Sequence, residues 1–367
     1  EQLSGGTREQ LFLAIRFALV REFARRGIEL PLIMDDLFVN FDQERTEAAA
    51  DCLIEVAREG QQVLIVVHPD PHCHLRPIAD DPAERSTDAG WGGEAVRLPL
   101  IQGADGCGDV VALGAGVEAT LLGRRVLLDP IIRRSHAGGT TYEYLGTDRD
   151  GCFAEYVVVP AANAVPVQSE WSDAELASFP CSYLAAENML ERAGVGAADT
   201  VLVSGASGGV GTAAIQLARR RGARVIALAA TAKTAALVAL GAAQVWPRDA
   251  DLPRVLGESS VDVVIDSVGG PQFPSLLRVL RAGGRYAVAG AIGGPIVELD
   301  LRTLYLKDLS FAGCTIPAPG VFAALVGYIE RGEIGPCVAL RFPLSQIVAA
   351  QQAFLAKSHV GKIVLEL

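Results

Sequence analysis

The chain has 367 residues, 50% of them hydrophobic and 20% charged, which is the composition of a globular protein and not of a disordered or fibrous one. Its formal net charge of -11 argues against a general affinity for nucleic acid, because such binding needs a surface rich in lysine and arginine. No apolar run approaches the roughly 18 residues that cross a bilayer, and the first residues do not show the charged-then-apolar pattern expected of a leader. The seven cysteines show no paired spacing, so we expect a cytoplasmic protein with neither a membrane nor a nucleic-acid partner.

The first segment combines four short motifs. LSGGT precedes a helix predicted from Thr7 to Arg26, and the strand LPLIMDD then carries two carboxylates to its end. Such a pair suits the Mg²⁺ shell and the attacking water of nucleotide hydrolysis. A helix from about Gln43 to Arg58 leads to the strand QVLIVV, which ends in a histidine. The candidate ATP-handling residues are Ser4, Gly5, Gly6, Asp35, Asp36 and His68.

These motifs, in this order and with NFD as a turn after the first strand, resemble the C-terminal half of an ABC-type ATPase domain of the chromosome-maintenance and DNA-repair kind, over residues 1–68. Asp36 stands where that family more often carries Glu. A complete ATPase also needs a GxxxxGK[ST] loop, and the comparable glycine cluster at 205–211 is followed by no lysine. The first segment is therefore predicted to be half an ATPase.

Residues 69–97 are rich in proline, aspartate and glycine and show no periodicity, which predicts a linker or junction. His68, His72, Cys73 and His74 resemble metal ligands in type, but no second spaced pair accompanies them. Residues 98–175 then hold short β-branched runs between glycine turns, such as DVVALGAGV, RRVLLDP and CFAEYVVVP. They predict a small β-rich domain.

From residue 176 to 315, helices and strands alternate. The strands are TVLVSG, RVIALA, VDVVID and GRYAVAG, and the helices are predicted at 182–194, from 208, at 232–240 and at 272–281. This alternation predicts a doubly wound parallel α/β sheet. Gly205, Gly208 and Gly211 fall between a strand and a helix, where glycines permit a tight turn and the close approach of a pyrophosphate. The segment is therefore predicted to bind a dinucleotide.

Several stretches from about residue 86 onward resemble the medium-chain dehydrogenases/reductases, close to their zinc-independent, quinone-oxidoreductase-like branch. They include IQGADGCGDVVALGAGV, ASFPCSYLAAENMLERAGV, GASGGVGTAAIQLA and FLAKSHVGKIVLEL. The resemblance implies a Rossmann domain inserted in a GroES-like β domain to which residues 316–367 return. Family members carry several dozen residues before the GAD segment, and here the ATPase-like half replaces them, so a truncated catalytic domain is expected.

The resemblance also implies a site and a reaction, which is hydride transfer from NAD(P)H to a small-molecule quinone, enone or carbonyl. The implied substrate-pocket residues are Asp105, Cys181 and Tyr183, although Asp105 is equally explained as a turn or salt-bridge residue and Tyr183 as core. The cofactor-binding residues expected at the glycine loop and the strand ends are Gly205, Gly208, Gly209, Val210, Gly211, Asp266, Gly269, Gly290 and Ala291.

Zinc is not expected. In zinc-dependent relatives one ligand lies in the replaced part, a histidine stands where this chain has Ala104, and a cysteine stands at Cys181, so one of the three ligands is retained. The span that holds a four-cysteine zinc lobe in such relatives contains Cys152 alone.

The predicted cofactor is NADPH in preference to NADH. NAD-binding relatives place an acid after the second strand, whereas residues 227–234 read ALAATAKT, with Thr231 and Lys233 placed to meet a 2′-phosphate. Lys233 also has an ordinary explanation as a solvated residue at a helix start. A homodimer through the Rossmann domain is a further expectation. Two alternatives stay open: an incomplete ATPase fragment, and a non-catalytic nucleotide-binding protein whose truncated domain no longer closes.

Overall fold

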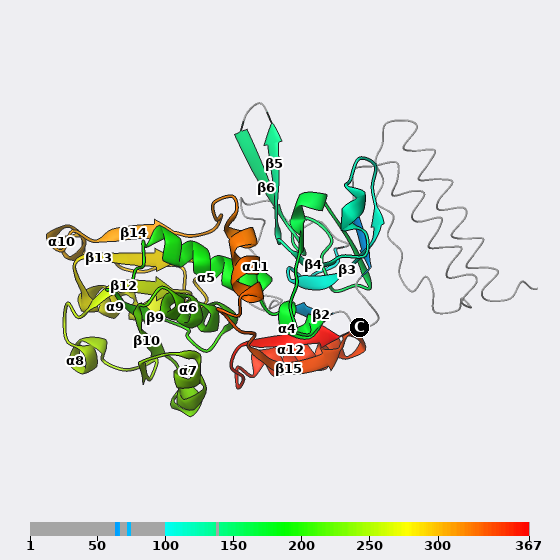
Figure 1. Ribbon diagram of the computed structural model, residues 1–367. Helices are drawn as coiled ribbons and strands as arrows, with labels where there is room; N and C mark the ends of the chain where they lie inside the picture. Colours follow the sequence, from blue (N-terminus) through cyan, green and yellow to red (C-terminus); the bar gives the residue numbers. More distant parts are fainter. Residues whose placement is uncertain (1–62, 67–71, 75–99, 137–138, 367) are drawn as a thin grey trace, which may run out of the picture.

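The computed structural model describes residues 63–66, 72–74, 100–136 and 139–366, the first two segments as backbone only (Figure 1). The α/β fold class is confirmed, with a β domain and a Rossmann domain built on a parallel sheet. The predicted ATP-handling residues Ser4, Gly5, Gly6, Asp35, Asp36 and His68 lie outside the described residues. Within the described part, no helix combines the length and the apolar character that crossing a bilayer demands.

The β domain is built on an eight-stranded sheet with the order β15-β16-β2-β3-β1-β7, to which β4 and β8 are added beside β3. The strands are β1 (Val63–Val66), β2 (His72–His74), β3 (Gly106–Leu113), β4 (Arg125–Leu128), β7 (Tyr156–Val159), β8 (Ala164–Pro166), β15 (Val338–Pro343) and β16 (Lys362–Glu366). Helices α4 (Asp173–Leu176) and α12 (Ile347–Leu355) pack on this sheet. Strands from both ends of the described chain share the sheet, so the domain is discontinuous in sequence.

Two segments before residue 98 lie in this sheet, which corrects their predicted assignment. The strand within QVLIVV forms as expected, but β1 pairs antiparallel with β3 and β7, so that Val63 lies opposite Leu113 and Val159. In the segment predicted as linker, β2 pairs with β3 and β16. An apolar run identifies a strand but not its partners, and here the partners are those of the β domain.

A hairpin of β5 (Ile131–His136) and β6 (Gly139–Tyr144) projects from the β domain (Figure 1). It was not predicted. Short 3-10 helices lie at Ala119–Leu121, Ala161–Asn163, Thr231–Lys233 (η4), Gly270–Gln272 and Leu344–Gln346.

The Rossmann domain contains a six-stranded parallel sheet with the order β11-β10-β9-β12-β13-β14. Its strands are β9 (Thr200–Val203), β10 (Arg224–Leu228), β11 (Gln244–Trp246), β12 (Val261–Asp266), β13 (Leu280–Val288) and β14 (Ser310–Gly313). Its helices are α5 (Pro180–Arg192), α6 (Gly209–Arg220), α7 (Thr234–Leu240), α8 (Leu252–Leu256), α9 (Phe273–Val279) and α10 (Leu301–Leu306). The strand order reverses at β9, and ligands of such sheets bind at this point, beyond the carboxyl ends of the strands.

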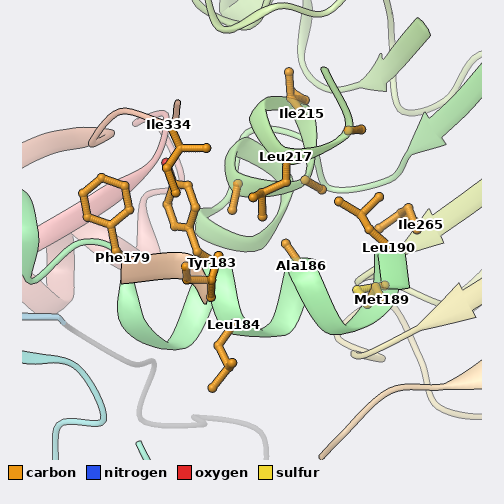
Figure 2. Close-up of a cluster of buried hydrophobic side chains, with 14 of the residues drawn as sticks. Phe179, Tyr183, Leu184, Ala186, Met189, Leu190, Ile215, Leu217, Ile265 and Ile334 are labelled. Atoms are coloured by element: carbon orange, nitrogen blue, oxygen red, sulfur yellow. The ribbon is translucent and has the colours of Figure 1, made fainter. Parts of the chain in front are cut away.

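Side chains of the buried strands alternate between the two faces of this sheet. Val201 and Val203 of β9 join the core under α5 and α6, and Leu202 joins the core under α8 and α9. Figure 2 shows Met189 and Leu190 of α5 beside Ile265 at one end of the first core. This packing fixes the start of α6, which follows the glycine loop.

Helix α11 (Val321–Glu330) belongs to the Rossmann core, although residues 316–367 were predicted to return to the β domain. Its buried side chains, including Phe322 and Leu325, pack against α5. The return to the β domain therefore begins with β15. The apolar stripe of α11 does not reveal in the sequence which neighbour will cover it.

Candidate functional site

The glycine loop joins β9 to α6, and two of its glycines are required by the packing of the chain itself. Gly205 has a φ of +55°, in the left-handed region, and a Cβ there would lie 2.8 Å from Cγ2 of Val268. A Cβ on Gly211 would lie 2.4 Å from the carbonyl oxygen of Gly205 and 2.5 Å from Cα of Ala206. Both positions exclude side chains regardless of any ligand.

Gly208 is different, because the protein around it leaves room. It is exposed, its φ is -80°, and a Cβ would come no closer than 3.5 Å to the carbonyl oxygen of Gly205. It caps the 12-residue helix α6, whose first N–H groups have no acceptor within the helix and carry the positive end of its dipole. A glycine that the fold does not need, at the start of a helix, fits the close approach of a phosphate group.

Gly209 shows what lies behind the helix start. A Cβ there would come within 2.5 Å of Ser182 Oγ and 2.7 Å of Lys362 Cε. Ser182 belongs to α5 and Lys362 to β16, so elements of both domains meet at this glycine. Val210 follows and packs against the core.

A buried ion pair lies at the same place. Asp105, just before β3, is 0% exposed, and its Oδ1 accepts a hydrogen bond from the backbone N–H of Cys181 at the start of α5. Its Oδ2 lies 3.6 Å from Nζ of Lys362, which is 3% exposed. A carboxylate at a helix N-terminus is favourable, and a buried charge normally has a partner of opposite charge. Asp105 thus joins three segments that are far apart in the sequence.

The other two predicted pocket residues lie in different surroundings. Cys181 is partly exposed beside Asp105. Tyr183 is buried in the core, where its ring centroid lies 4.6 Å from that of Phe179 (Figure 2). Its hydroxyl donates to the carbonyl of Gly335 at 2.7 Å and accepts from Nε2 of Gln216 at 2.7 Å. Burial raises the pKa of Tyr183 well above its usual value. Tyr183 therefore lies in the core, which is the second of the two roles that the sequence left open for it.

Asp266, at the end of β12, is fully buried and organises the strand ends. It accepts hydrogen bonds from the Tyr286 hydroxyl at 2.5 Å, from the N–H groups of Val268 and Gly269 at 2.9 and 3.1 Å, and from the Ser204 hydroxyl. Burial, and then the charge of Asp266, raise the pKa of Tyr286. These contacts shape the loop after β12, and the role of Asp266 toward the cofactor stays a prediction.

The loops after β12 and β13 pack backbone against backbone. A Cβ on Gly290 would lie 2.7 Å from the carbonyl oxygen of Ser267, and one on Gly269 would lie 3.1 Å from that of Gly294. Ala291, which follows, is exposed. The predicted strand-end residues are thus brought together at the carboxyl edge of the sheet.

The C-terminal segment folds over the glycine loop from the other side. Lys233 of η4 donates from Nζ to Ser207 Oγ at 3.2 Å and to the carbonyl of Lys357 at 2.7 Å. The N–H of Gly361 donates to the carbonyl of Ser207 at 2.9 Å. Burial, and then the charges of Arg248 and Lys357, lower the pKa of Lys233. Thr231, in the same turn, is exposed. Lys233 therefore contacts the glycine loop, and its contact with a 2′-phosphate stays a prediction.

Sequence reasoning missed several residues of this region: Ser182, Arg248, Lys357, His359 and Lys362. The stretch FLAKSHVGKIVLEL was recognised as characteristic of a family, but nothing in it marks Lys362 as buried. Its contact with Asp105 spans more than two thirds of the chain and depends on the tertiary fold.

A catalytic zinc takes about three protein ligands. Ala104 supplies none, and in the described ranges no three His, Cys, Asp or Glu side chains converge as a metal site. The described residues therefore do not fit a catalytic zinc centre.

The sequence matches two known family descriptions: "Alcohol dehydrogenase GroES-like domain" over residues 81–169, and "Zinc-binding dehydrogenase" over residues 209–331. The first match begins at residue 81, inside the predicted linker. The part that resembles the family therefore begins before residue 86, where the resemblance was predicted to start. Neither match reaches residues 1–68, whose likeness to an ABC-type ATPase stays a prediction.

Among related proteins, the chain is 30% identical to an acryloyl-coenzyme A reductase of Metallosphaera sedula, over 74% of this chain and 84% of the relative. It is 26% identical to the human quinone oxidoreductase, over 86% of this chain and 92% of the relative.

Two solved structures show the same architecture. A putative alcohol dehydrogenase from Sinorhizobium meliloti 1021 is 42% identical, with a TM-score of 0.77, over 84% of this chain and 89% of that one. The 2-octenoyl-CoA carboxylase reductase CinF, in complex with NADP and 2-octenoyl-CoA, is 25% identical, with a TM-score of 0.72, over 83% of this chain and 79% of that one.

Proposed function

Because the chain belongs to the medium-chain dehydrogenase/reductase family and is an NAD(P)-dependent oxidoreductase of that kind, we propose that it uses NADPH to reduce a quinone, an enone or a carbonyl compound without zinc. The observation that carries the proposal is the open position at Gly208. The N–H groups at the start of α6 would hold the pyrophosphate there, and the loops after β12 and β13 would lie along the nicotinamide half. A bound cofactor supplies the hydride chemistry itself.

The choice of NADPH is supported by charge. Residues 227–234 carry no carboxylate, and Lys233 reaches the glycine loop beside the end of β10, where an adenosine ribose is expected. The related CinF structure contains NADP. A hydrogen bond to a charged group contributes about 1.5–3 kcal/mol, which is about ten- to a hundredfold in affinity.

The proposed acceptor class is supported by the relatives and by the donor set. Acryloyl-coenzyme A and quinones both conjugate a double bond with a carbonyl, and these are the compounds that the names of two relatives contain. Such acceptors take up hydride with little electrophilic help, which agrees with a site whose described residues do not fit zinc. Cys181 is partly exposed beside the buried Asp105, and we propose that it lines the acceptor site.

We also propose that two copies associate through the β14 edge of the Rossmann sheet. Close to this edge strand in sequence, Tyr305 and Leu306 are 61% and 70% exposed, and Phe311 on the strand itself is 40% exposed. Exposed apolar side chains beside a sheet edge suit pairing with a second copy. Sedimentation should give a dimer that Leu306→Glu weakens, and a monomeric wild-type chain would rule this assembly out.

A matched pair of glycine variants tests the function. Gly208→Ala has room in the protein and should keep the unfolding temperature within about 3 °C of wild type, while the methyl group weakens NADPH binding by about tenfold or more. Gly211→Ala would instead clash with the backbone of Gly205 and Ala206 and lower the stability of the chain. Fluorescence titration with NADPH and NADH reads out binding. The proposal fails if neither cofactor binds wild type, or if Gly208→Ala binds as tightly as wild type.

A further inference from the structure

The segment that follows β14 lies at the carboxyl edge of the Rossmann sheet. Backbone hydrogen bonds continue the sheet past its strand ends, since the N–H of Ala289 donates to the carbonyl of Asp266 at 3.1 Å and that of Cys314 donates to Val288 at 2.9 Å. Neighbouring strands lie about 4.8 Å apart, so the chain at Cys314 is one strand spacing beyond the loop after β13. The proposed cofactor would lie along the loops after β12 and β13, and this segment therefore borders the outer end of its nicotinamide half.

Arg192, the last residue of α5, holds this segment by its backbone. Its two terminal nitrogens donate to the carbonyl of Gly313 at 3.2 Å and to the carbonyl of Ile316 at 3.1 Å. Its Nε donates to Oδ1 of the buried Asn188 at 3.1 Å. A guanidinium is planar and presents its donors in a fixed fork, so three acceptors at once fix its orientation. Through this fork, Arg192 fixes the path of the chain between residues 313 and 316.

A second arginine holds the same segment from the β domain. Arg133, on the unpredicted hairpin strand β5, donates from Nη2 to the carbonyl of Pro317 at 3.4 Å. Its Nη1 donates to Oδ2 of Asp129 at 3.0 Å, and Oδ1 of Asp129 accepts from the N–H of Ile131 at 3.0 Å. A hydrogen bond between two charged groups is stronger than one between neutral groups, so Asp129 keeps Arg133 in place. The segment is thus held by arginines from both domains.

The same stretch of backbone offers hydrogen-bond donors to a ligand. Among the residues that the structure describes, the N–H groups of Thr315 and Ile316 have no acceptor. Cys314 is buried in the core, whereas Thr315 is exposed, so one side of the segment packs against the protein and the other is open. The carboxamide of a nicotinamide ring carries a carbonyl oxygen that accepts such hydrogen bonds.

We propose that Arg192 and Arg133 are positioning residues for the nicotinamide ring, which hold residues 313–317 in the shape in which the N–H groups of this segment bind the ring's carboxamide. This inference rests on the proposed function. Both arginines act through the backbone, because their donors are already engaged by its carbonyls. A segment that is ordered before binding costs less to order on binding. Hydride transfer also depends on the placement of the ring, since a shift of about 1 Å can cost about a hundredfold in rate.

The experiment is calorimetric titration of the full chain with NADPH and with 2′-phospho-ADP-ribose, which has the same adenosine and pyrophosphate groups but no nicotinamide. Arg192→Met keeps much of the side-chain length without its donors, and it should weaken NADPH binding about tenfold and 2′-phospho-ADP-ribose binding less than about twofold. Arg133→Met removes one carbonyl contact and should weaken NADPH binding about threefold, with the same selectivity. NADH and ADP-ribose form a second pair for the same comparison.

Two further variants serve as controls. Arg192→Lys keeps a donor and a positive charge, and it should recover part of the loss. Arg278→Met, at an exposed ion pair, should bind all four ligands as wild type does. If Arg192→Met does not fold, Arg192→Lys and Arg133→Met provide the same selective comparison.

The outcomes separate the two proposals. A role of Arg192 in the fold alone would weaken both members of a ligand pair equally, or would lower the unfolding temperature without changing either affinity. Either result overturns the positioning role and leaves the proposed function standing. The positioning role also falls if wild type binds each cofactor no more tightly than its fragment without nicotinamide. If neither cofactor binds wild type, the proposed function falls and this inference falls with it.

Discussion

Two charged clusters flank the glycine loop, and the C-terminal segment 357–362 contributes to both. The Asp105–Lys362 pair is sealed from solvent and balanced in charge, and it links the β domain to the start of α5. Lys233 is partly exposed, and the charges of Arg248 and Lys357 act on it. A protein interior accepts a charge only with a partner, whereas cations at an open site leave a place for an anion that arrives from solution. We therefore expect the Asp105–Lys362 pair to stabilise the fold and Lys233 to meet an anionic group of the cofactor.

The largest expected effect concerns the sealed pair. Lys362→Met removes the cation and leaves the Asp105 carboxylate buried, which should lower the free energy of unfolding by about 3–5 kcal/mol in urea denaturation. The double variant Asp105→Asn with Lys362→Met removes both charges and should recover much of that loss.

The matched control for this experiment is an exposed ion pair. Arg278 and Glu258 are 56% and 61% exposed, so Arg278→Met should leave the free energy of unfolding almost unchanged. If Lys362→Met is as stable as this control, the buried Asp105–Lys362 pair does not stabilise the fold, and the contrast between the two clusters is wrong.

A smaller effect is expected at the open cluster. Lys233→Ala should weaken NADPH binding about tenfold and NADH binding less than about threefold, because the cation meets a phosphate that NADH lacks. Raising the salt concentration should weaken NADPH binding more than NADH binding, since the added contact is ionic and partly exposed. Arg302→Ala, at an exposed ion pair on α10, serves as the control. Equal losses for the two cofactors in Lys233→Ala would show that this lysine supports the loop rather than the choice of cofactor.

The same contrast explains what could be predicted from the sequence. The alternating strands and helices and the loop at Gly205–Gly211 depend on local periods and turn chemistry, and they were predicted close to their observed bounds. The absence of an acid after β10 is equally local, and Lys233 does reach the loop. Other features depend on neighbours that are distant in the sequence: the partners of β1, the place of α11 in the Rossmann core and the burial of Tyr183. The local apolar pattern of each segment does not identify these neighbours. Lys362 and His359 were missed for the same reason, since a lysine becomes a buried partner only where the fold brings a carboxylate to it.

The smallest effect is expected in the tests for metal, because the purified chain should contain almost no zinc. Asp105 is already engaged by the Cys181 N–H and by Lys362, and Ala104 offers no ligand atom, so among these residues a cation at Cys181 would find no further free ligand. Elemental analysis of the purified chain should give less than about 0.1 zinc per chain, and added zinc should not raise the unfolding temperature. Cys181→Ala should leave both results unchanged, as should Cys337→Ala, which removes another partly exposed thiol as a control. About one zinc per chain that disappears in Cys181→Ala would mean that residues outside the described ranges complete a catalytic site. Zinc that disappears only in His72→Ala or His74→Ala would instead place the metal on β2 and leave the charge balance at Asp105 intact.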